Sequence, residues 1–310
     1  MLIRPWLKAA HAYVSDPFRD VPADPVLHAD IRSRQKARKT YVIFFTPRSG
    51  STRLASILSS TGLLGMPSEV FNPFHIVPVA TACAARTLDA YLDALPRVKC
   101  AGGVFGFKIT CMQVLMMFRR EARFFETFRG AAFFWLIRED IVAQAVSSSR
   151  MVQTGVPRAL GSARRARASE ASFQYQAGDI RRRIRRLRWM ERRSERFFRR
   201  FGISPVRLSY ERLLCLDESQ TAGVFADALG VKLPADVQAA SQYLKVGTGK
   251  AEEFAERFRR EHPAFVARIE ADRQPLLEAL DEMPPGNLQD RSSPPDRPQA
   301  AHRAARGRGT

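Results

Sequence analysis

Short apolar runs alternate along the chain with segments in which apolar residues recur every three to four positions. The apolar runs lie at Tyr41–Thr46, Val104–Thr110 and Ala132–Ile137, with a weaker run at Pro205–Leu208. Bounded runs of this length, rich in Val, Ile and Phe, are typical of buried strands. Strands separated by helical segments indicate βαβ units, so the sequence predicts an α/β fold with a parallel sheet and helices on both faces.

The segments between these runs have the spacing of amphipathic helices. The predicted helices are Ser51–Thr61, Thr87–Ala94, Met112–Phe128, Asp140–Thr154, Asp179–Phe201, Gln220–Leu229 and Ala251–Arg260. In the longest, one apolar stripe is made by Ile180, Ile184, Leu187, Met190, Ser194, Phe198 and Phe201. The arginines of that helix fall on its other face. We expect one large domain over residues 39–283.

The two ends of the chain differ in composition from its centre. Residues 1–38 are mixed and basic near Arg32–Lys39, and we treat them as a leading segment. Residues 284–310 are rich in Pro, Gly, Arg and small residues, and we expect this tail to be disordered. No apolar stretch reaches the roughly 18 residues of a membrane span, and the amino terminus lacks an apolar signal core. These features favour a cytoplasmic protein, one that could contact the inner membrane surface.

The formal net charge of +19 favours anionic partners such as nucleic acid, anionic lipid or phosphorylated ligands. Fifteen arginines and only four acidic residues lie between Arg158 and Arg200. This Arg158–Arg200 block could bind nucleic acid or an anionic membrane, or it could be a solvated helix face. No recognised DNA- or RNA-binding motif accompanies it, so nucleic acid is the less favoured partner.

The cysteines do not have the spacing of a metal site or a disulfide framework. Cys83, Cys100, Cys111 and Cys215 form no C-x-x-C pair and accompany no histidine cluster. We therefore expect reduced, mostly buried thiols and no metal.

The segment TPRSGSTRL, from Thr46 to Leu54, directly follows the first predicted strand and enters the first predicted helix. Such a turn gathers backbone N–H groups and a helix N-terminus around one point, which suits an anion. Gly50 permits close approach of the backbone, and Arg48 can bind a phosphate through two N–H groups. Ser51 and Thr52 add hydroxyl groups. The alternative is a plain helix cap, with Arg48 in solvent.

Two familiar phosphate-binding loops do not match this segment. A Walker loop requires a lysine where this chain has Ser51, and a phosphatase loop requires a cysteine that the residues before Arg48 do not provide. The missing lysine, together with the lack of a convincing magnesium-binding acid after the loop, also disfavours a nucleotide kinase.

The segment YVIFFTPRSGSTRLASILSSTGLLGMPSEVFNP resembles the opening of bacterial carbohydrate sulfotransferases of the trehalose 2-sulfotransferase type. The resemblance continues, in the family's order, through GGVFGFKIT, LIREDIVAQAVSSSRMVQTG, FFRRFGISPVRLSYERL and EEFAERFRRE, and covers about residues 40–262. It implies a P-loop-like α/β fold and the donor 3′-phosphoadenosine 5′-phosphosulfate (PAPS), without a metal. It further implies a carbohydrate or glycolipid hydroxyl as acceptor and a tendency to form homodimers.

The resemblance also implies which residues hold the donor. The 5′-phosphosulfate loop would consist of Arg48, Ser49, Gly50, Ser51 and Thr52. Arg138 at a strand end and Ser147 in the next helix would hold the 3′-phosphate. The spacing between these two residues is nine, whereas many sulfotransferases use eight. The position that would give eight is Glu139, an acid that would repel phosphate.

Glu69, in the loop-like stretch PSEVFNP, matches the glutamate that the family uses as general base. A carboxylate suits this role if burial raises its pKa toward the working pH. Considered without the resemblance, a loop glutamate is more often exposed to solvent. His75 is the alternative base, although a histidine among apolar neighbours is more often structural.

Four further residues are candidates for the site. Lys108 ends the second predicted strand and could stabilise the transferring sulfuryl group, or its chain could extend along the surface into solvent. Phe71 could stack on a sugar or belong to the core. Lys245 and Lys250, in a late loop, could contact the nucleotide.

Overall fold

The computed structural model describes residues 16–155, 171–243 and 249–280. At its centre is a five-stranded sheet with the order β2-β3-β1-β4-β5. The strands are β1 (Lys39–Phe45), β2 (Cys100–Ala101), β3 (Val104–Ile109), β4 (Ala132–Ile137) and β5 (Val206–Ser209). Strands β1, β3, β4 and β5 are parallel, and only β2 is antiparallel to its neighbour. The predicted α/β class and its four parallel strands are confirmed.

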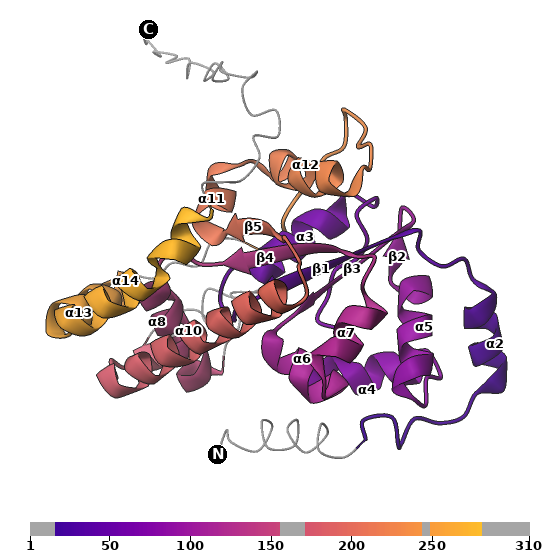
Figure 1. Ribbon diagram of the computed structural model, residues 1–310, viewed down its shortest axis with the longest axis horizontal. Coiled ribbons are helices and arrows are strands. Elements are labelled where there is room, and N and C mark those ends of the chain that lie inside the picture. Colours follow the sequence, from indigo (N-terminus) through magenta and orange to yellow (C-terminus); the bar gives the residue numbers. More distant parts are fainter. Residues whose placement is uncertain (1–15, 156–170, 244–248, 281–310) are drawn as a thin grey trace, which may run out of the picture.

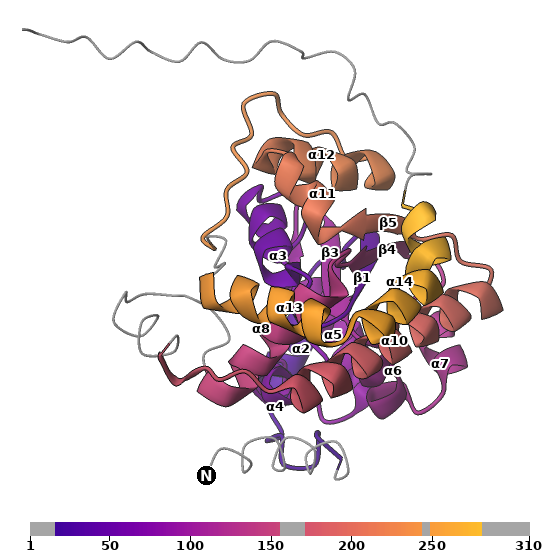
Figure 2. The same ribbon diagram turned by 90° about the vertical axis from the view of Figure 1, so that its left-hand side faces the viewer.

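Helices cover both faces of this sheet (Figure 1). In chain order they are α2 (Pro25–Ser33), α3 (Ser51–Ser60), α4 (Pro73–Ala82), α5 (Leu88–Val98), α6 (Cys111–Phe118), α7 (Glu121–Thr127), α8 (Ile141–Thr154), α10 (Ala177–Arg200), α11 (Tyr210–Cys215), α12 (Glu218–Leu229), α13 (Gly249–Glu261) and α14 (Pro263–Glu278). Helices α3, α11 and α12 lie on one side of the strands, and α6, α7 and α10 lie on the other (Figure 2).

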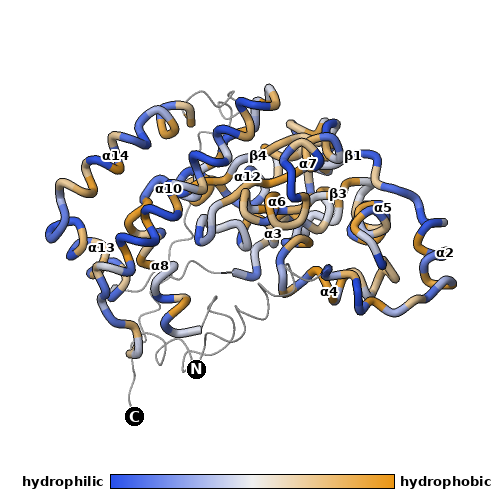
Figure 3. Tube along the Cα trace, turned by 60° about the horizontal axis from the view of Figure 1, so that its bottom comes forward, coloured by the Kyte–Doolittle hydropathy of each residue, from blue (hydrophilic) through white to orange (hydrophobic). Residues whose placement is uncertain are grey.

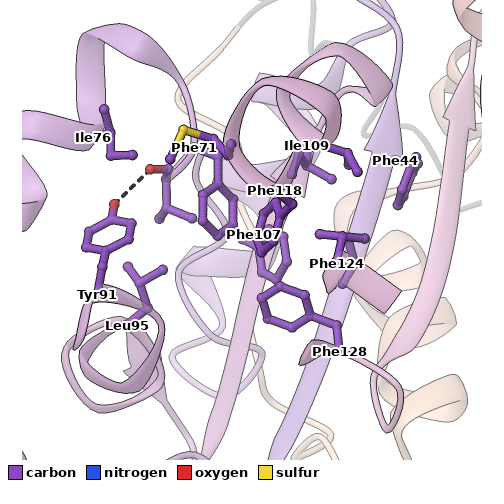
Figure 4. Close-up of a cluster of buried hydrophobic side chains, with 14 of the residues drawn as sticks. Phe44, Phe71, Ile76, Tyr91, Leu95, Phe107, Ile109, Phe118, Phe124 and Phe128 are labelled. Atoms are coloured by element: carbon purple, nitrogen blue, oxygen red, sulfur yellow. Dashed lines mark hydrogen bonds between the residues drawn. The ribbon is translucent and has the colours of Figure 1, made fainter. Parts of the chain in front are cut away.

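Each sheet face has its own apolar core, because successive strand residues point to opposite faces. Ile43, Leu58 and Phe225 belong to the core on the side of α3 and α12. The opposite core is rich in phenylalanine, and its rings meet mainly edge to face (Figure 4). Phe71 is fully buried there, with its ring centroid 5.3 Å from those of Phe107 and Phe118. The suggestion that Phe71 stacks on a sugar is therefore wrong.

A third apolar cluster joins α8, α10, α13 and α14 beside the sheet. The predicted stripe of α10 is buried at Ile180, Ile184, Leu187, Met190, Ser194 and Phe198. Figure 3 shows apolar and polar residues interleaved along α10 and α14, as expected for helices with one buried face.

Part of the leading segment packs on the domain. Phe18, Val21 and Ile31 are buried in the phenylalanine-rich core, and α2 packs against α5. Asp24 caps α2 by accepting a hydrogen bond from the N–H of Leu27, at 2.8 Å. The predicted tail, residues 284–310, lies outside the described residues.

The single helix predicted over Met112–Phe128 is wrong. The structure has two helices there, α6 and α7, and they are separated at Arg119, whose φ of 58° is outside the helical range. Helix α6 starts with a capping box in which Thr110 and Gln113 satisfy each other's backbone N–H groups. A continuous run of apolar and charged residues hid this break in the sequence.

The four cysteines are free thiols with different exposure: Cys83 and Cys111 are buried, Cys100 is half-buried and Cys215 is exposed. Burial raises the pKa of the Cys111 thiol to about 11. At pH 8 we expect iodoacetamide to modify Cys215 and to spare Cys111, because only about one Cys111 thiol in a thousand is then ionised. Timed alkylation followed by peptide mass spectrometry checks this. Equal rates at the two sites in the native protein would contradict it.

The strand order reverses its direction between β1 and β4. From β1 the chain continues to β3 on one side, and from β4 it continues to β5 on the other. Ligands of open α/β sheets bind where neighbouring strands are followed by connections in opposite directions. The segments after β1 and β4 contain Arg48, Arg138 and Ser147, so the topology brings these residues to one edge.

Candidate functional site

The loop after β1 has an unusual backbone. Arg48 and Gly50 both have positive φ, 70° and 79°, and Gly50 is the N-cap of α3. No side chain caps this helix, so its first N–H groups point into the loop unpaired by a cap. The alternative that Ser51 or Thr52 merely caps the helix is therefore wrong. Only glycine fits at position 50, because a Cβ there would lie 2.4 Å from Cδ2 of Tyr210.

Helix α8 orients the loop through two side chains. Gln144 is fully buried, and its Nε2 donates hydrogen bonds of 2.8 Å to Oγ1 of Thr46 and to the carbonyl of Pro47. One turn further along α8, Ser147 accepts a hydrogen bond of 3.1 Å from Nε of Arg48. Ser147 is thus placed at the loop arginine. Gln144 was not predicted, because a glutamine in an amphipathic helix gives no signal of its partner.

Ser49 adds a buried hydroxyl to the loop. Its side chain is fully buried, and within the described ranges its Oγ has no hydrogen-bond partner. Buried polar groups are nearly always satisfied, so a hydroxyl of this kind beside a helix N-terminus suits a ligand oxygen.

Lys108, on β3, connects the loop to a carboxylate. Its side chain is 5% exposed, and its Nζ lies 3.5 Å from Oγ of Ser51, 3.3 Å from Oγ1 of Thr52 and 3.5 Å from Oε1 of Glu69. The alternative that this lysine extends along the surface into solvent is wrong. A buried ammonium between two hydroxyls and a carboxylate is a fixed positive charge at the base of the site.

Glu69 reaches Lys108 because the chain before it pairs briefly with β3. Ser68 forms a parallel bridge with Phe107, and its carbonyl accepts from the N–H of Lys108 at 3.1 Å. The Glu69 side chain is 19% exposed, and its Oε2 accepts a hydrogen bond of 2.7 Å from Nδ2 of Asn72. Glu69 is therefore half-buried and held from two sides. His75 is exposed on α4.

Arg138 leaves the end of β4 and lies over an aromatic ring. Its guanidinium carbon is 4.9 Å from the centroid of Tyr210, and its Nε is 3.5 Å from Oε1 of Glu211. The same Tyr210 ring packs against Gly50, so it lies between the loop and Arg138. Tyr210 belongs to the quoted segment SYERL, but nothing in that segment indicated its position.

Glu139 does not stand unpaired beside Arg138. Its Oε1 accepts hydrogen bonds from Oγ of Ser209 and, at 3.2 Å, from Nε of Arg212. This contact with Arg212 is also an ion pair. The negative charge that raised doubt about an anion site here is balanced by a neighbouring arginine.

The backbone at the end of β4 is held by a buried ion pair. Arg273 of α14 donates hydrogen bonds of 2.6 Å to the carbonyls of Arg138 and Glu139. The same guanidinium pairs with Glu191 of α10 at 2.9 Å, and the two side chains are 1% and 0% exposed. No feature of the sequence indicated this contact, because Arg273 and Glu191 each look like ordinary charged helix residues.

The two late lysines were candidates for contacting the nucleotide. Lys250 lies on α13 with its Nζ 5.8 Å from the ring centroid of Phe254, and Lys245 is outside the described residues. Within the described ranges there is no grouping of three His, Cys, Asp or Glu side chains that could share a metal ion. No described helix has the length and apolar character needed to cross a membrane.

Much of the charge of the Arg158–Arg200 block is used inside the fold. Helix α10 carries eleven arginines. Six of these form ion pairs with carboxylates: Arg182, Arg183, Arg188, Arg192, Arg193 and Arg200. Hydrogen bonds, that from Arg188 above all, hold the pKa of Asp272 below its usual value. Residues 156–170 of the block lie outside the described part of the chain.

The chain belongs to the Stf0 sulphotransferase family, whose model matches residues 40–261, and its largely parallel sheet flanked by helices is consistent with a sulfotransferase fold. The resemblance stated for residues 40–262 is confirmed. The chain is 28% identical over 268 residues to a trehalose 2-sulfotransferase of Mycobacterium tuberculosis (strain Erdman), covering 74% of this chain and 97% of that protein. It is 26% identical over 229 residues to a trehalose 2-sulfotransferase of Mycolicibacterium smegmatis, covering 61% and 84%.

Proposed function

We propose that this sulfotransferase moves a sulfuryl group from PAPS to a hydroxyl of a carbohydrate. The position of Lys108 carries the proposal. One buried ammonium lies within 3.5 Å of Glu69, Ser51 and Thr52, and so joins the proposed base to the proposed donor loop. These residues come from three separate segments of the chain. The printed names of the mycobacterial relatives support a carbohydrate acceptor.

The loop and its surroundings suit the donor's 5′-phosphosulfate. The uncapped N-terminus of α3 supplies N–H groups and the positive end of a helix dipole, and Ser49 and Arg48 add donors. In sulfuryl transfer the departing phosphate oxygen gains negative charge, so fixed donors at that point stabilise the transition state. We assign Arg138 to the 3′-phosphate, with Tyr210 setting its distance from the loop. Ser147 orients Arg48 and faces the same edge.

Glu69 is the proposed general base. Its carboxylate takes the proton of the acceptor hydroxyl as that oxygen bonds to sulfur, while the bond between sulfur and the phosphate oxygen breaks and its electron pair stays on the phosphate. Asn72 holds one carboxylate oxygen, which leaves the other facing Lys108. A glycolipid would satisfy the same chemistry, because only the sugar hydroxyl reacts.

The alternative function, binding of nucleic acid or anionic lipid through the Arg158–Arg200 block, has weaker support. Six of the eleven arginines of α10 already pair with carboxylates of α10 itself or of neighbouring helices, and a paired arginine contributes little to long-range attraction of a polyanion. We therefore propose the enzymatic function.

Calorimetric binding of 3′-phosphoadenosine 5′-phosphate tests the donor site at about 0.3 M salt, where diffuse charge attraction is screened. We expect one equivalent to bind the native protein in preference to AMP, and the affinity of Arg48→Ala to fall about tenfold or more, since a charged hydrogen bond is lost. Arg34→Ala, the matched control, removes the same charge from an exposed pair with Asp30 at the end of α2. Equal binding by both variants would contradict the assignment of the loop.

The acceptor is tested separately, by incubating the protein with PAPS and single sugars, trehalose first, and measuring sulfated product by mass spectrometry. Product with a sugar confirms the acceptor class. Donor binding without product from any sugar would leave the donor site in place and remove the carbohydrate acceptor.

A further inference from the structure

A cavity lies away from the proposed donor site, between α10 and the strands β4 and β5. Its volume is about 540 Å³. The residues that line it are Trp135, Arg188, Arg192, Glu195, Arg196, Phe198, Arg199, Ile203 and Arg207. Five of these nine are arginines, so the cavity is strongly basic.

Three of these arginines have no charged partner among the residues that the structure describes. Arg188 and Arg192 pair with Asp272 at 2.6 and 2.5 Å. In contrast, the side chains of Arg196, Arg199 and Arg207 form no hydrogen bond or ion pair with any residue of the described ranges. The carboxylate that lines the cavity, Glu195, is 3.7 Å from Arg188 rather than paired with these three. Uncompensated positive charge is therefore concentrated at this cavity.

Two buried N–H donors in the cavity wall also lack acceptors. Trp135 is 1% exposed, and its indole Nε1 has no hydrogen-bond partner within the described chain. The same holds for Nε of Arg207. Trp135 and Arg207 are direct neighbours in the register of β4 and β5, so their side chains leave the same face of the sheet. Buried donors without acceptors are rare, and an ordered water, an ion or a ligand atom is what completes them.

We propose that this cavity binds a phosphate or sulfate group. All the unpaired groups are donors or cations, and guanidinium and indole N–H groups match the oxygens of a tetrahedral anion. The cavity has room for a larger molecule that carries such a group. Its wall is formed by Trp135 and Arg207, whereas the donor loop follows the end of β1, so the proposal does not depend on the proposed function.

Inorganic pyrophosphate is the probe, titrated into full-length Arg48→Ala at about 0.15 M salt so that the donor loop does not contribute. Binding is followed by calorimetry and tryptophan emission. We expect one equivalent to bind, and the affinity to fall about tenfold or more in Arg196→Ala/Arg199→Ala, because two charged contacts are lost. The matched control, Arg182→Ala/Arg200→Ala, removes the same charge from exposed positions of the same helix and should bind within about twofold.

The Trp135→Phe variant distinguishes binding at a specific site from nonspecific attraction by positive charge. It keeps an aromatic ring but removes the N–H donor, so we expect affinity to fall about threefold to tenfold while the change in emission disappears. The proposal would be overturned if the two double variants weakened binding equally, or if Trp135→Phe left the affinity unchanged. It would also be overturned if neither pyrophosphate nor the lipid vesicles described next bound the protein.

A parallel titration with phosphatidylglycerol vesicles distinguishes the sources of the anion. If the vesicles alone bind, with the same dependence on Arg196, Arg199 and Trp135, the ligand is a lipid headgroup. If pyrophosphate alone binds with that dependence, the ligand is a soluble phosphate or sulfate compound. Vesicle binding that is indifferent to these three residues counts against the cavity.

Discussion

Exchanging Glu69 for glutamine is expected to lower kcat for sulfuryl transfer by about 10²–10⁴-fold, the usual contribution of a general base. The amide keeps the shape of the side chain and its contact with Asn72, but it cannot take a proton at neutral pH. Binding of 3′-phosphoadenosine 5′-phosphate should stay within about threefold of the native value, because Glu69 contacts the donor loop only through Lys108. The rate is measured with the sugar selected by the acceptor screen.

The control for this prediction is His75→Gln, the same kind of change at the alternative base. His75 is exposed on α4, so we expect nearly native kcat. If His75→Gln loses activity and Glu69→Gln does not, the base is His75. If neither substitution lowers kcat, proton transfer to a side chain does not limit the rate and the role given to Glu69 is wrong.

Replacing Arg273 with methionine is expected to lower the free energy of unfolding by about 3–5 kcal/mol, because one partner of a buried ion pair is removed. Glu191, fully buried, would keep only the longer contact with Arg188, at 3.5 Å. The carbonyls of Arg138 and Glu139 would also lose their donors. Urea unfolding of the purified variant measures the change.

Two further variants show whether burial is the cause. Arg192→Met makes the same chemical change in an exposed residue whose pair with Asp272 is 2.5 Å long, and should cost about 1 kcal/mol or less. Adding Glu191→Gln to Arg273→Met should recover part of the loss, since the uncompensated charge is then removed. Equal costs for Arg273→Met and Arg192→Met would show that the buried pair adds nothing.

The sheet could be predicted from the sequence because β1, β3 and β4 are buried on both faces and appear as continuous apolar runs. Short or weakly patterned elements could not be predicted in this way. Strand β2 has two residues, and α14 begins at Pro263 and contains Pro275, a residue that sequence analysis takes as the end of a helix. The break at Arg119 was also missed, because the sequence around it has no glycine or proline to mark a positive φ.

The residues of the candidate site also divide into those that local sequence pattern could predict and those that it could not. The loop Arg48–Thr52 follows β1 and Lys108 lies near the end of β3, where short-range pattern is informative, whereas Glu69 was singled out by the family resemblance. The structure brings Lys108 into contact with Ser51, Thr52 and Glu69. Their roles stay predictions until the variants are measured. Tyr210 and Gln144 act through long-range contacts with the loop, and a single sequence carries no record of such pairs. For Phe71 the sequence left a sugar contact and a core position open, and burial in the structure decides for the core.

The buried pair of Arg273 and Glu191 also indicates how far along the chain the folded enzyme extends. The family match stops at residue 261, yet Arg273 lies on α14, beyond that limit, and holds the strand end that carries Arg138. A chain shortened to the matched residues would leave Glu191 buried without this partner and free the backbone of β4 at its end. Expression of the minimal enzyme should therefore extend at least through Leu280, whose carbonyl accepts from Arg212 at 2.9 Å.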